Sequence, residues 1–203
     1  MMKNFWSLVV VMGLAVSAFG QQAKKGLSPE GGDVDERGSA RVLYWDLDND
    51  HSAGQFAVNY GRPGWKKEYE DPAKFDAMTK GKVWRMGSNF WTELDTCLPL
   101  KISGKPVGVG VYYLGMKRSA DGAKWSLVFI DPAKIRAMKM DGFEINKAPI
   151  WFETPVTFEK ASTTAEKLTI TMNYKKEDMR HVTMKVQWGN MELAAPIEVT
   201  VSQ

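Results

Sequence analysis

The chain has 203 residues and a formal net charge of +3, from 27 Lys and Arg against 24 Asp and Glu. This even mixture argues against an electrostatic nucleic-acid-binding protein, which needs a concentrated basic face. The single cysteine, Cys97, excludes an internal disulfide, so burial of apolar side chains must stabilise the fold.

The N-terminal segment has the composition of a secretory signal peptide. Lys3 precedes an apolar run from Phe5 to Ala18, and Ala18 and Gly20 stand at the two positions that a signal peptidase reads. The run is short for a bilayer and polar sequence follows at once, which disfavours the alternative of a retained membrane anchor. We therefore expect a signal peptide at 1–20, export to the periplasm or the cell exterior, and no transmembrane segment after cleavage.

Residues 21–40 are polar, rich in glycine and charge, and lack a hydrophobic period. Such a composition predicts a flexible leader. Removing 1–20 takes away Lys3 and no acid, which leaves 26 basic against 24 acidic residues. About 180 residues then remain, and a single domain of that size buries a sufficient core. We expect that domain to span 41–203.

From Arg41 onward, runs rich in β-branched and aromatic residues alternate with turn residues. In the first, Phe56, Val58 and Tyr60 share one face, which is the two-residue period of a half-buried strand. Further strand-like runs lie at 109–116, 125–130, 150–159, 167–174, 182–188 and 191–201.

The last two of these runs are separated by Gly189-Asn190, a pair suited to a tight turn. We expect 182–201 to form a hairpin about this turn, with Trp188 in the core. In TELDTCLPLKI, alternation predicts that the leucines and Ile102 face inward and that Glu93, Asp95 and Cys97 face outward.

Two segments, 71–78 and 131–140, read as short helices. Each begins Asp-Pro-Ala-Lys, in which aspartate caps the helix and proline occupies its first position. Many short strands, few helices and glycine- or proline-rich turns predict an all-β protein, an antiparallel β-sandwich of two packed sheets with one or two short helices.

Three strings, YGRPG (60–64), GKVWRMGSN (81–89) and KISGKPVGVGVYY (101–113), together resemble a family of exported bacterial proteins known as domain of unknown function 2911. The matching positions are Tyr60, Arg62, Pro63, Gly81, Val83, Trp84, Arg85, Gly87, Asn89, Thr92, Gly104, Lys105, Gly110 and Tyr112. The resemblance covers roughly Gln55 to the C-terminus. It implies a domain and an exported location, because the family has no settled activity to carry over.

Three positions depart from the family pattern. The glutamate that follows the asparagine in the family is Phe90 here, and the Lys-Gly-Arg after Arg-Pro is 66–68, Lys-Lys-Glu. The loop before Val-Trp-Arg is also shorter. If the family shares a polar pocket, this member lacks one of its carboxylates.

The candidate binding residues are Arg62, Trp84, Arg85, Asn89 and Thr92. One interpretation places them in a polar recess, where arginine forks bind an anion or a sugar. The other, which we favour for Arg85, is structural: the arginines tie loops together through backbone carbonyls or carboxylates. On that interpretation, we expect Arg62 and Asn89 to make any contact with a ligand.

The backbone around Arg85 also carries expectations. We expect Trp84 and Met86 to face the core. Gly87 is expected to end the strand in a backbone shape that a side chain resists, and Asn89 to stabilise the next turn through its own amide. Of the tryptophans, Trp65 and Trp91 lie where exposure would let them stack on a sugar, whereas Trp125 and Trp188 lie in strand patterns typical of a core.

Catalytic chemistry has weaker support. A hydrolase would use Glu93 and Asp95, or Glu68, with a bound water. Cys97 lacks a histidine at any known spacing and is read as structural. The acidic run 45–54 has His51 and Ala57 where a calcium loop needs glycine and glutamate, so a solvated turn is the better interpretation.

The chain has no Gly-x-Ser-x-Gly, no glycine-rich phosphate loop, no Cys-x-x-Cys and no His-Glu-x-x-His. We therefore expect no cofactor and no metal. The first hypothesis for function is an exported, non-catalytic binding or interaction module for a small molecule or an envelope partner. The alternatives are the carboxylate hydrolase and a structural envelope protein.

Overall fold

The computed structural model describes residues 26–201. The expected signal peptide at 1–20 lies outside these residues. Val34–Gln203 group into one unit, separate from Met1–Asp33, and the description below concerns the larger unit. Its first strand begins at Arg37, inside the segment expected to be a flexible leader. Gly38 permits this pairing, since the Tyr60 ring occupies the space that a side chain at Gly38 would need.

Ten strands occur in the described part of the chain: β1 (Arg37–Asp46), β2 (His51–Gly61), β3 (Val83–Trp84), β4 (Thr92–Thr96), β5 (Leu100–Ile102), β6 (Lys105–Val107), β7 (Gly110–Arg118), β8 (Trp125–Ile130), β9 (Ile150–Lys175) and β10 (Asp178–Val199). They pair in the order β1-β2-β4-β7-β8-β9-β10-β5-β6, with β3 added to β7. Every pair of neighbouring strands is antiparallel.

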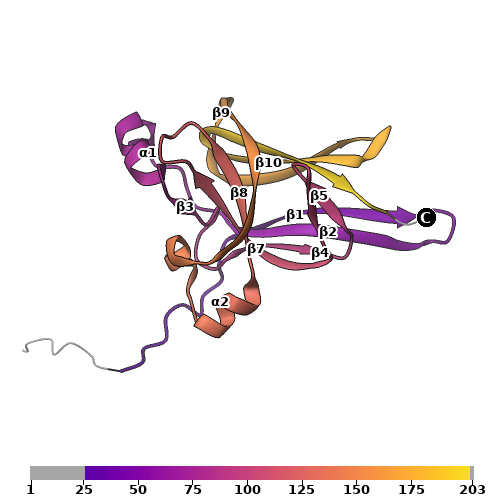
Figure 1. The fold of residues 1–203 in the computed structure, drawn as a ribbon, viewed down its shortest axis with the longest axis horizontal. Helices are drawn as coiled ribbons and strands as arrows, with labels where there is room; N and C mark the ends of the chain where they lie inside the picture. Colours follow the sequence, from indigo (N-terminus) through magenta and orange to yellow (C-terminus); the bar gives the residue numbers. More distant parts are fainter. Residues whose placement is uncertain (1–25, 202–203) are drawn as a thin grey trace, which may run out of the picture. The chain divides into compact units, whose positions relative to one another are not determined.

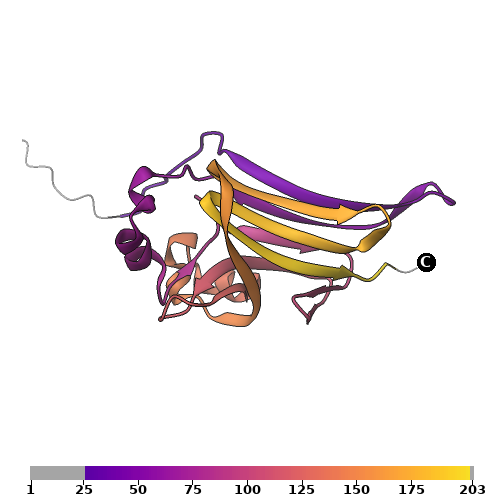
Figure 2. The same ribbon diagram turned by 90° about the horizontal axis from the view of Figure 1, so that it is seen from above.

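The long strand β9 connects the two sheets. Its residues from Ile150 to Val156 pair with β8, and those from Thr157 to Lys175 pair with β10. The chain thus leaves the sheet of β1, β2, β4, β7 and β8 and enters that of β10, β5 and β6. Figure 2 shows β9, in orange, curving from one to the other.

The apolar faces of both sheets form one core. Phe56 on β2, Leu114 on β7, Leu168 on β9 and Val186 on β10 belong to a single cluster of buried side chains. Burial of apolar area on this scale is the main stabilising contribution available to a domain without disulfides. The all-β fold of antiparallel strands with a few short helices is thereby confirmed.

The C-terminal hairpin is not where the sequence predicts it. β10 runs without interruption through Gly189-Asn190, and the chain reverses earlier, between β9 and β10. The pairing register shifts on both sides of Gly189, so this glycine forms a bulge within the strand instead of a turn. Trp188 is buried, as expected, with 5% of its surface exposed.

The helical elements are η1 (Lys67–Glu70), α1 (Pro72–Thr79), α2 (Pro132–Met138) and η2 (Gly142–Lys147). The predicted caps are confirmed: Asp71 accepts a hydrogen bond from the Ala73 amide and Asp131 from the Ala133 amide. Figure 1 shows α1 at the end of the sheets opposite the β1–β2 turn. Within residues 26–201, no helix has the length and apolar character needed to cross a membrane.

Candidate functional site

The segment between β3 and β4 leaves the edge of β7 and returns to it without reversing the chain, because both strands pair antiparallel with β7. Two of its residues have strained backbone. Met86 and Asn89 adopt left-handed backbone, with φ of 57° and 58°. Such φ values are uncommon outside glycine and cost free energy unless surrounding contacts enforce them. Thr92, completely buried, donates its hydroxyl to the Met86 carbonyl oxygen at 2.8 Å and so holds this conformation.

Gly87 is required for a reason other than the predicted one. It does not have a positive φ. A Cβ there would instead lie 2.6 Å from the Thr92 hydroxyl oxygen, and a Cβ on Gly61 would lie 2.2 Å from the Ser88 carbonyl oxygen. The two glycines therefore allow the Arg-Pro-Gly loop and the Val-Trp-Arg segment to pack backbone against backbone.

The Arg-Pro-Gly loop is also bound to the second sheet. The Pro63 carbonyl oxygen accepts hydrogen bonds from the Leu168 amide at 3.0 Å and from the Trp188 indole at 2.9 Å. The Trp65 amide donates to the Glu166 carbonyl oxygen at 2.7 Å. These bonds place strings that are far apart in sequence around the Trp188 ring.

Trp65 packs into the bulge of β10. A Cβ on Gly189 would lie 2.1 Å from the Trp65 ring, and Gly189 has a φ of +59°. The rings of Trp65 and Trp188 meet edge to face with centroids 5.1 Å apart. Trp84 stacks on Trp188, with ring centroids 5.0 Å apart and an angle of 17° between the ring planes. Aromatic pairs of this geometry stabilise beyond their buried area.

A cavity of about 460 Å³ opens beside this aromatic group, and we call it the aromatic cavity. Six aromatic residues line it: Tyr69, Phe75, Trp84, Trp125, Phe143 and Trp188. Met78 and Met191 add flexible apolar surface, while Lys66, Arg85 and Ser88 are among its few polar residues. No carboxylate lies among the described residues that line it. An apolar, aromatic lining with a few polar groups is typical of a small-molecule site.

Arg85 is half-buried at this cavity, and its guanidinium donates hydrogen bonds to backbone carbonyls. Nε donates to the Gly87 carbonyl oxygen at 3.3 Å and Nη1 donates to the Asn89 carbonyl oxygen, while the Phe143 ring lies 4.2 Å from the guanidinium carbon. Burial lowers the pKa of Arg85, and the charges of Asp141 and Asp35 oppose that shift. These bonds match the structural interpretation of Arg85.

The remaining candidate residues do not line the aromatic cavity. The Arg62 side chain donates to the Leu168 carbonyl oxygen at 3.2 Å and lies 3.7 Å from Glu36. The Asn89 amide donates to Asp35 and not to its own turn, which corrects the expected role. With Thr92 buried beneath Met86, only Trp84 and Arg85 of the five candidates line the aromatic cavity.

Residues 46–197 match a family described as "Protein of unknown function (DUF2911)". The chain is a member of the DUF2911 family. This match confirms the resemblance drawn from the three strings. Searches of curated proteins and of solved structures found no match.

The carboxylates of the hydrolase alternative lie elsewhere in this DUF2911 domain. Glu93 and Asp95 point outward from β4, between β2 and β7, as alternation predicts. They and Glu68 are absent from the described lining of the aromatic cavity. Cys97 is exposed, and its sulfur contacts the backbone nitrogen and oxygen of Gln55 at 3.0 and 3.1 Å.

The two tryptophans expected to be exposed differ in burial. Trp91 is buried, 2% exposed, and stacks on Tyr113 at 5.0 Å, so it is not available to a sugar. The Trp65 indole nitrogen is also buried, within the aromatic group. The prediction of exposure is therefore wrong for Trp91, whereas Trp65 is only partly buried and packs against Trp188.

The contribution of the helices to the site was not predicted from the sequence. Tyr69, Phe75 and Met78 reach the aromatic cavity from η1 and α1, and Phe143 reaches it from η2. The one available signal was the aromatic and methionine content of segments that flank the family strings. Trp125 and Trp188 were correctly expected to be buried, and both also line the cavity.

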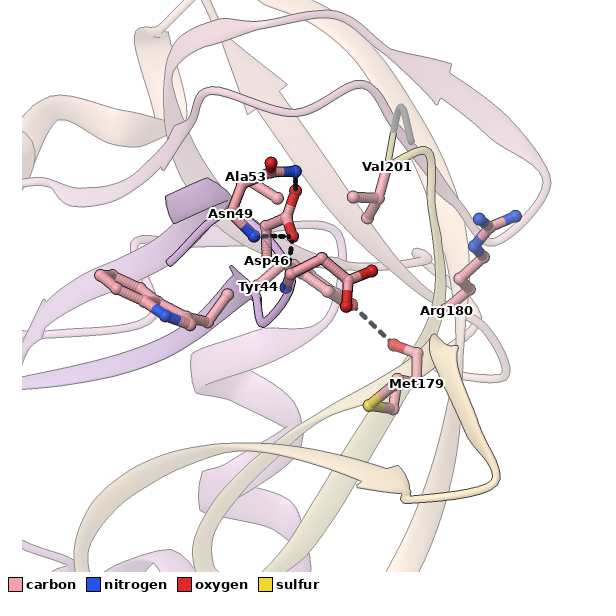
Figure 3. Close-up of a pocket in the computed structure, with 9 residues that line it drawn as sticks. Tyr44, Asp46, Asn49, Ala53, Met179, Arg180 and Val201 are labelled. Atoms are coloured by element: carbon pink, nitrogen blue, oxygen red, sulfur yellow. Dashed lines mark hydrogen bonds between the residues drawn. The ribbon is translucent and has the colours of Figure 1, made fainter. Parts of the chain in front are cut away.

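A larger cavity of about 550 Å³ lies between the β1–β2 turn and the β9–β10 turn. Figure 3 shows the Tyr44 hydroxyl donating to the Met179 carbonyl oxygen, at 2.7 Å, across it. The Asp46 carboxylate accepts bonds from the Asp48 amide and from Asn49, which lowers its pKa, chiefly through the Asn49 side chain. These polar groups form hydrogen bonds within and between the two turns, so they are less available to a ligand than the lining of the aromatic cavity.

Proposed function

We propose that this DUF2911 domain is an exported, non-catalytic binding module that holds a small, largely apolar molecule in the aromatic cavity. The observation that carries the proposal is the lining: aromatic rings from β3, β8, β10 and three helical segments converge on one volume. A domain that needed these rings only for stability would fill the space, because protein interiors pack without large voids.

Three further observations support a binding role. Two of the three segments that carry the family strings, 60–64 and 81–89, meet at this cavity through Gly61 and Gly87. The strained backbone of Met86 lies directly beside it, and such strain concentrates at functional sites. The carboxylates that a hydrolase would use do not line it, so the binding module is favoured over the enzyme. Export rests on the N-terminal sequence alone.

The test is titration of the purified protein with N-phenyl-1-naphthylamine, a neutral apolar dye that fluoresces on entering an apolar site. We expect saturable binding at one site. Met78→Trp should abolish it, because the larger ring occupies the cavity. Met138→Trp is the matched control, since Met138 occupies the equivalent position of α2 and is 54% exposed.

Equal binding by both tryptophan variants and the wild-type protein would place the dye elsewhere. Absence of saturable binding by the wild-type protein would contradict the proposal. Thermal unfolding of each variant confirms that loss of binding is not loss of fold.

A further inference from the structure

Arg85 has more binding capacity than its structural bonds use. A guanidinium carries five N–H donors in a planar fork. Within residues 26–201, the hydrogen bonds of Arg85 are made by Nε and Nη1, to the carbonyls of Gly87 and Asn89. Neither acceptor is charged, and Nη2 has no hydrogen-bond partner among the described residues.

Arg85 also forms no direct ion pair with a described residue, and Asp141 and Asp35 act on its charge only from beyond ion-pair distance. In the described part of the chain, no carboxylate oxygen lies within the 4.0 Å of an ion pair with it. Two other arginines near the site are paired: Arg118 lies 2.6 Å from Asp76, and Arg62 lies 3.7 Å from Glu36. A half-buried charge without a partner is costly, and proteins normally pair it.

Arg85 is held in place at the aromatic cavity. Two carbonyls and the Phe143 ring orient its guanidinium, and a Cβ on Gly142 would lie 3.1 Å from Nη1, so the backbone of η2 packs closely against it. The other cation of the lining, Lys66, has a side chain that is 67% exposed and lies near Glu68. A preorganised cation beside an aromatic lining is suited to a ligand that carries one anionic group on an apolar body.

We infer that the ligand of the aromatic cavity is an apolar or aromatic anion, a carboxylate or sulfonate whose charged group is bound by Arg85. This inference rests on the proposed function, to which it adds the charge of the ligand. The apolar body contacts the rings of Trp84, Phe75 and Tyr69. The anionic group supplies the direct ion-pair partner that Arg85 lacks among residues 26–201.

The experiment compares two dyes with the same aromatic body. 8-Anilinonaphthalene-1-sulfonate carries a sulfonate, and N-phenyl-1-naphthylamine is the same molecule without it. We expect the wild-type protein to bind the sulfonate at least about tenfold more tightly, the factor typical of one charge-assisted hydrogen-bonded contact. This comparison requires no variant to fold.

The variants assign the preference to one residue. Arg85→Gln should remove it, weakening the sulfonate by about tenfold while the neutral dye changes less than about twofold. Arg85→Lys should retain part of it, since lysine keeps the charge and loses the fork. Arg41→Gln is the matched control: it removes the same charge from an exposed position on β1.

The outcomes separate the two proposals. If the neutral dye binds in the cavity and the sulfonate binds no more tightly, the inference fails and the binding function stands. If the preference is lost in Lys66→Gln and kept in Arg85→Gln, the anion is bound at the rim and the inference also fails. If neither dye binds the wild-type protein, both proposals fail.

Discussion

At the scale of single residues, the site depends on glycines whose lack of a side chain lets another segment pack directly against their backbone. Gly61 and Gly87 bring two loops together, and Gly189 admits the Trp65 ring into β10. In each case the sequence shows only a glycine, and the partner lies on another element. The role of such a residue is steric and cannot be inferred from local turn preferences alone.

Gly189→Ala is expected to be strongly destabilising. The new methyl group would enter the space of the Trp65 ring, and the residue would keep a φ of +59°. Overpacking and left-handed strain together should lower the free energy of unfolding by about 2–4 kcal/mol, measured by urea denaturation. Gly104→Ala is the control, because Gly104 has a φ of +83° with no atom within 4 Å of the added Cβ. It should lose only about 1 kcal/mol. Equal losses for both would show that Trp65 yields without cost.

At the scale of elements, α1 is attached to the sheets by a small polar cluster. Arg118 on β7 lies 2.6 Å from Asp76, donates to the Thr79 hydroxyl at 2.9 Å, and is in cation–π contact with Phe75 and Trp125. Phe75 also lines the aromatic cavity. The position of α1, and with it one wall of the site, therefore depends on this cluster.

Asp76→Asn should weaken that attachment in a pH-dependent way. Hydrogen bonds from Lys80 and Arg118 lower the pKa of Asp76 from its ordinary value of 3.8. A carboxylate with a lowered folded-state pKa stabilises the fold above its unfolded-state pKa, and this contribution is lost as the pH falls through the folded value. The wild-type protein should thus melt at a higher temperature than Asp76→Asn at neutral pH, and the difference should shrink as the pH falls below 3.8 toward the lowered pKa of the folded state.

Thermal unfolding followed by tryptophan fluorescence, from about pH 7 to about pH 3, measures this difference. Asp95→Asn serves as the control, because Asp95 is an exposed carboxylate on β4. A constant gap between wild type and Asp76→Asn across the whole range would show that the charge of Asp76 does not hold α1.

At the scale of the whole molecule, the proposed cleavage of a signal peptide is compatible with the fold. On the proposal of export, a domain whose single cysteine is Cys97 must obtain its stability from the core, and the core here spans both sheets. The first strand, β1, begins at Arg37, so a chain cleaved after Gly20 would keep every strand of the domain.

Intact-mass measurement on protein isolated from its native host tests the export proposal. We expect a mature chain that begins at Gln21 or within a residue or two, because Ala18 and Gly20 are the small residues that a signal peptidase requires before its cleavage site. The same chain expressed without residues 1–20 should give the matching mass and the same melting temperature. A mass that retains Met1 to Gly20 would refute both cleavage and the assignment of that segment as a signal.

Local pattern determined much of this protein. Alternation in β4 and β5, the Asp-Pro helix starts, the burial of Trp188 and the family strings were all readable, since each depends on residues close together in the chain. Tertiary structure decided the rest. Gly189-Asn190 has the residues typical of a turn. The Trp65 ring, from another segment, packs against Gly189 at the bulge, and β10 continues beyond it. The aromatic cavity likewise joins Phe75, Trp84, Phe143 and Trp188, whose separation along the chain hides their contact. Close packing between distant segments settles such positions, and a local sequence pattern carries no record of it.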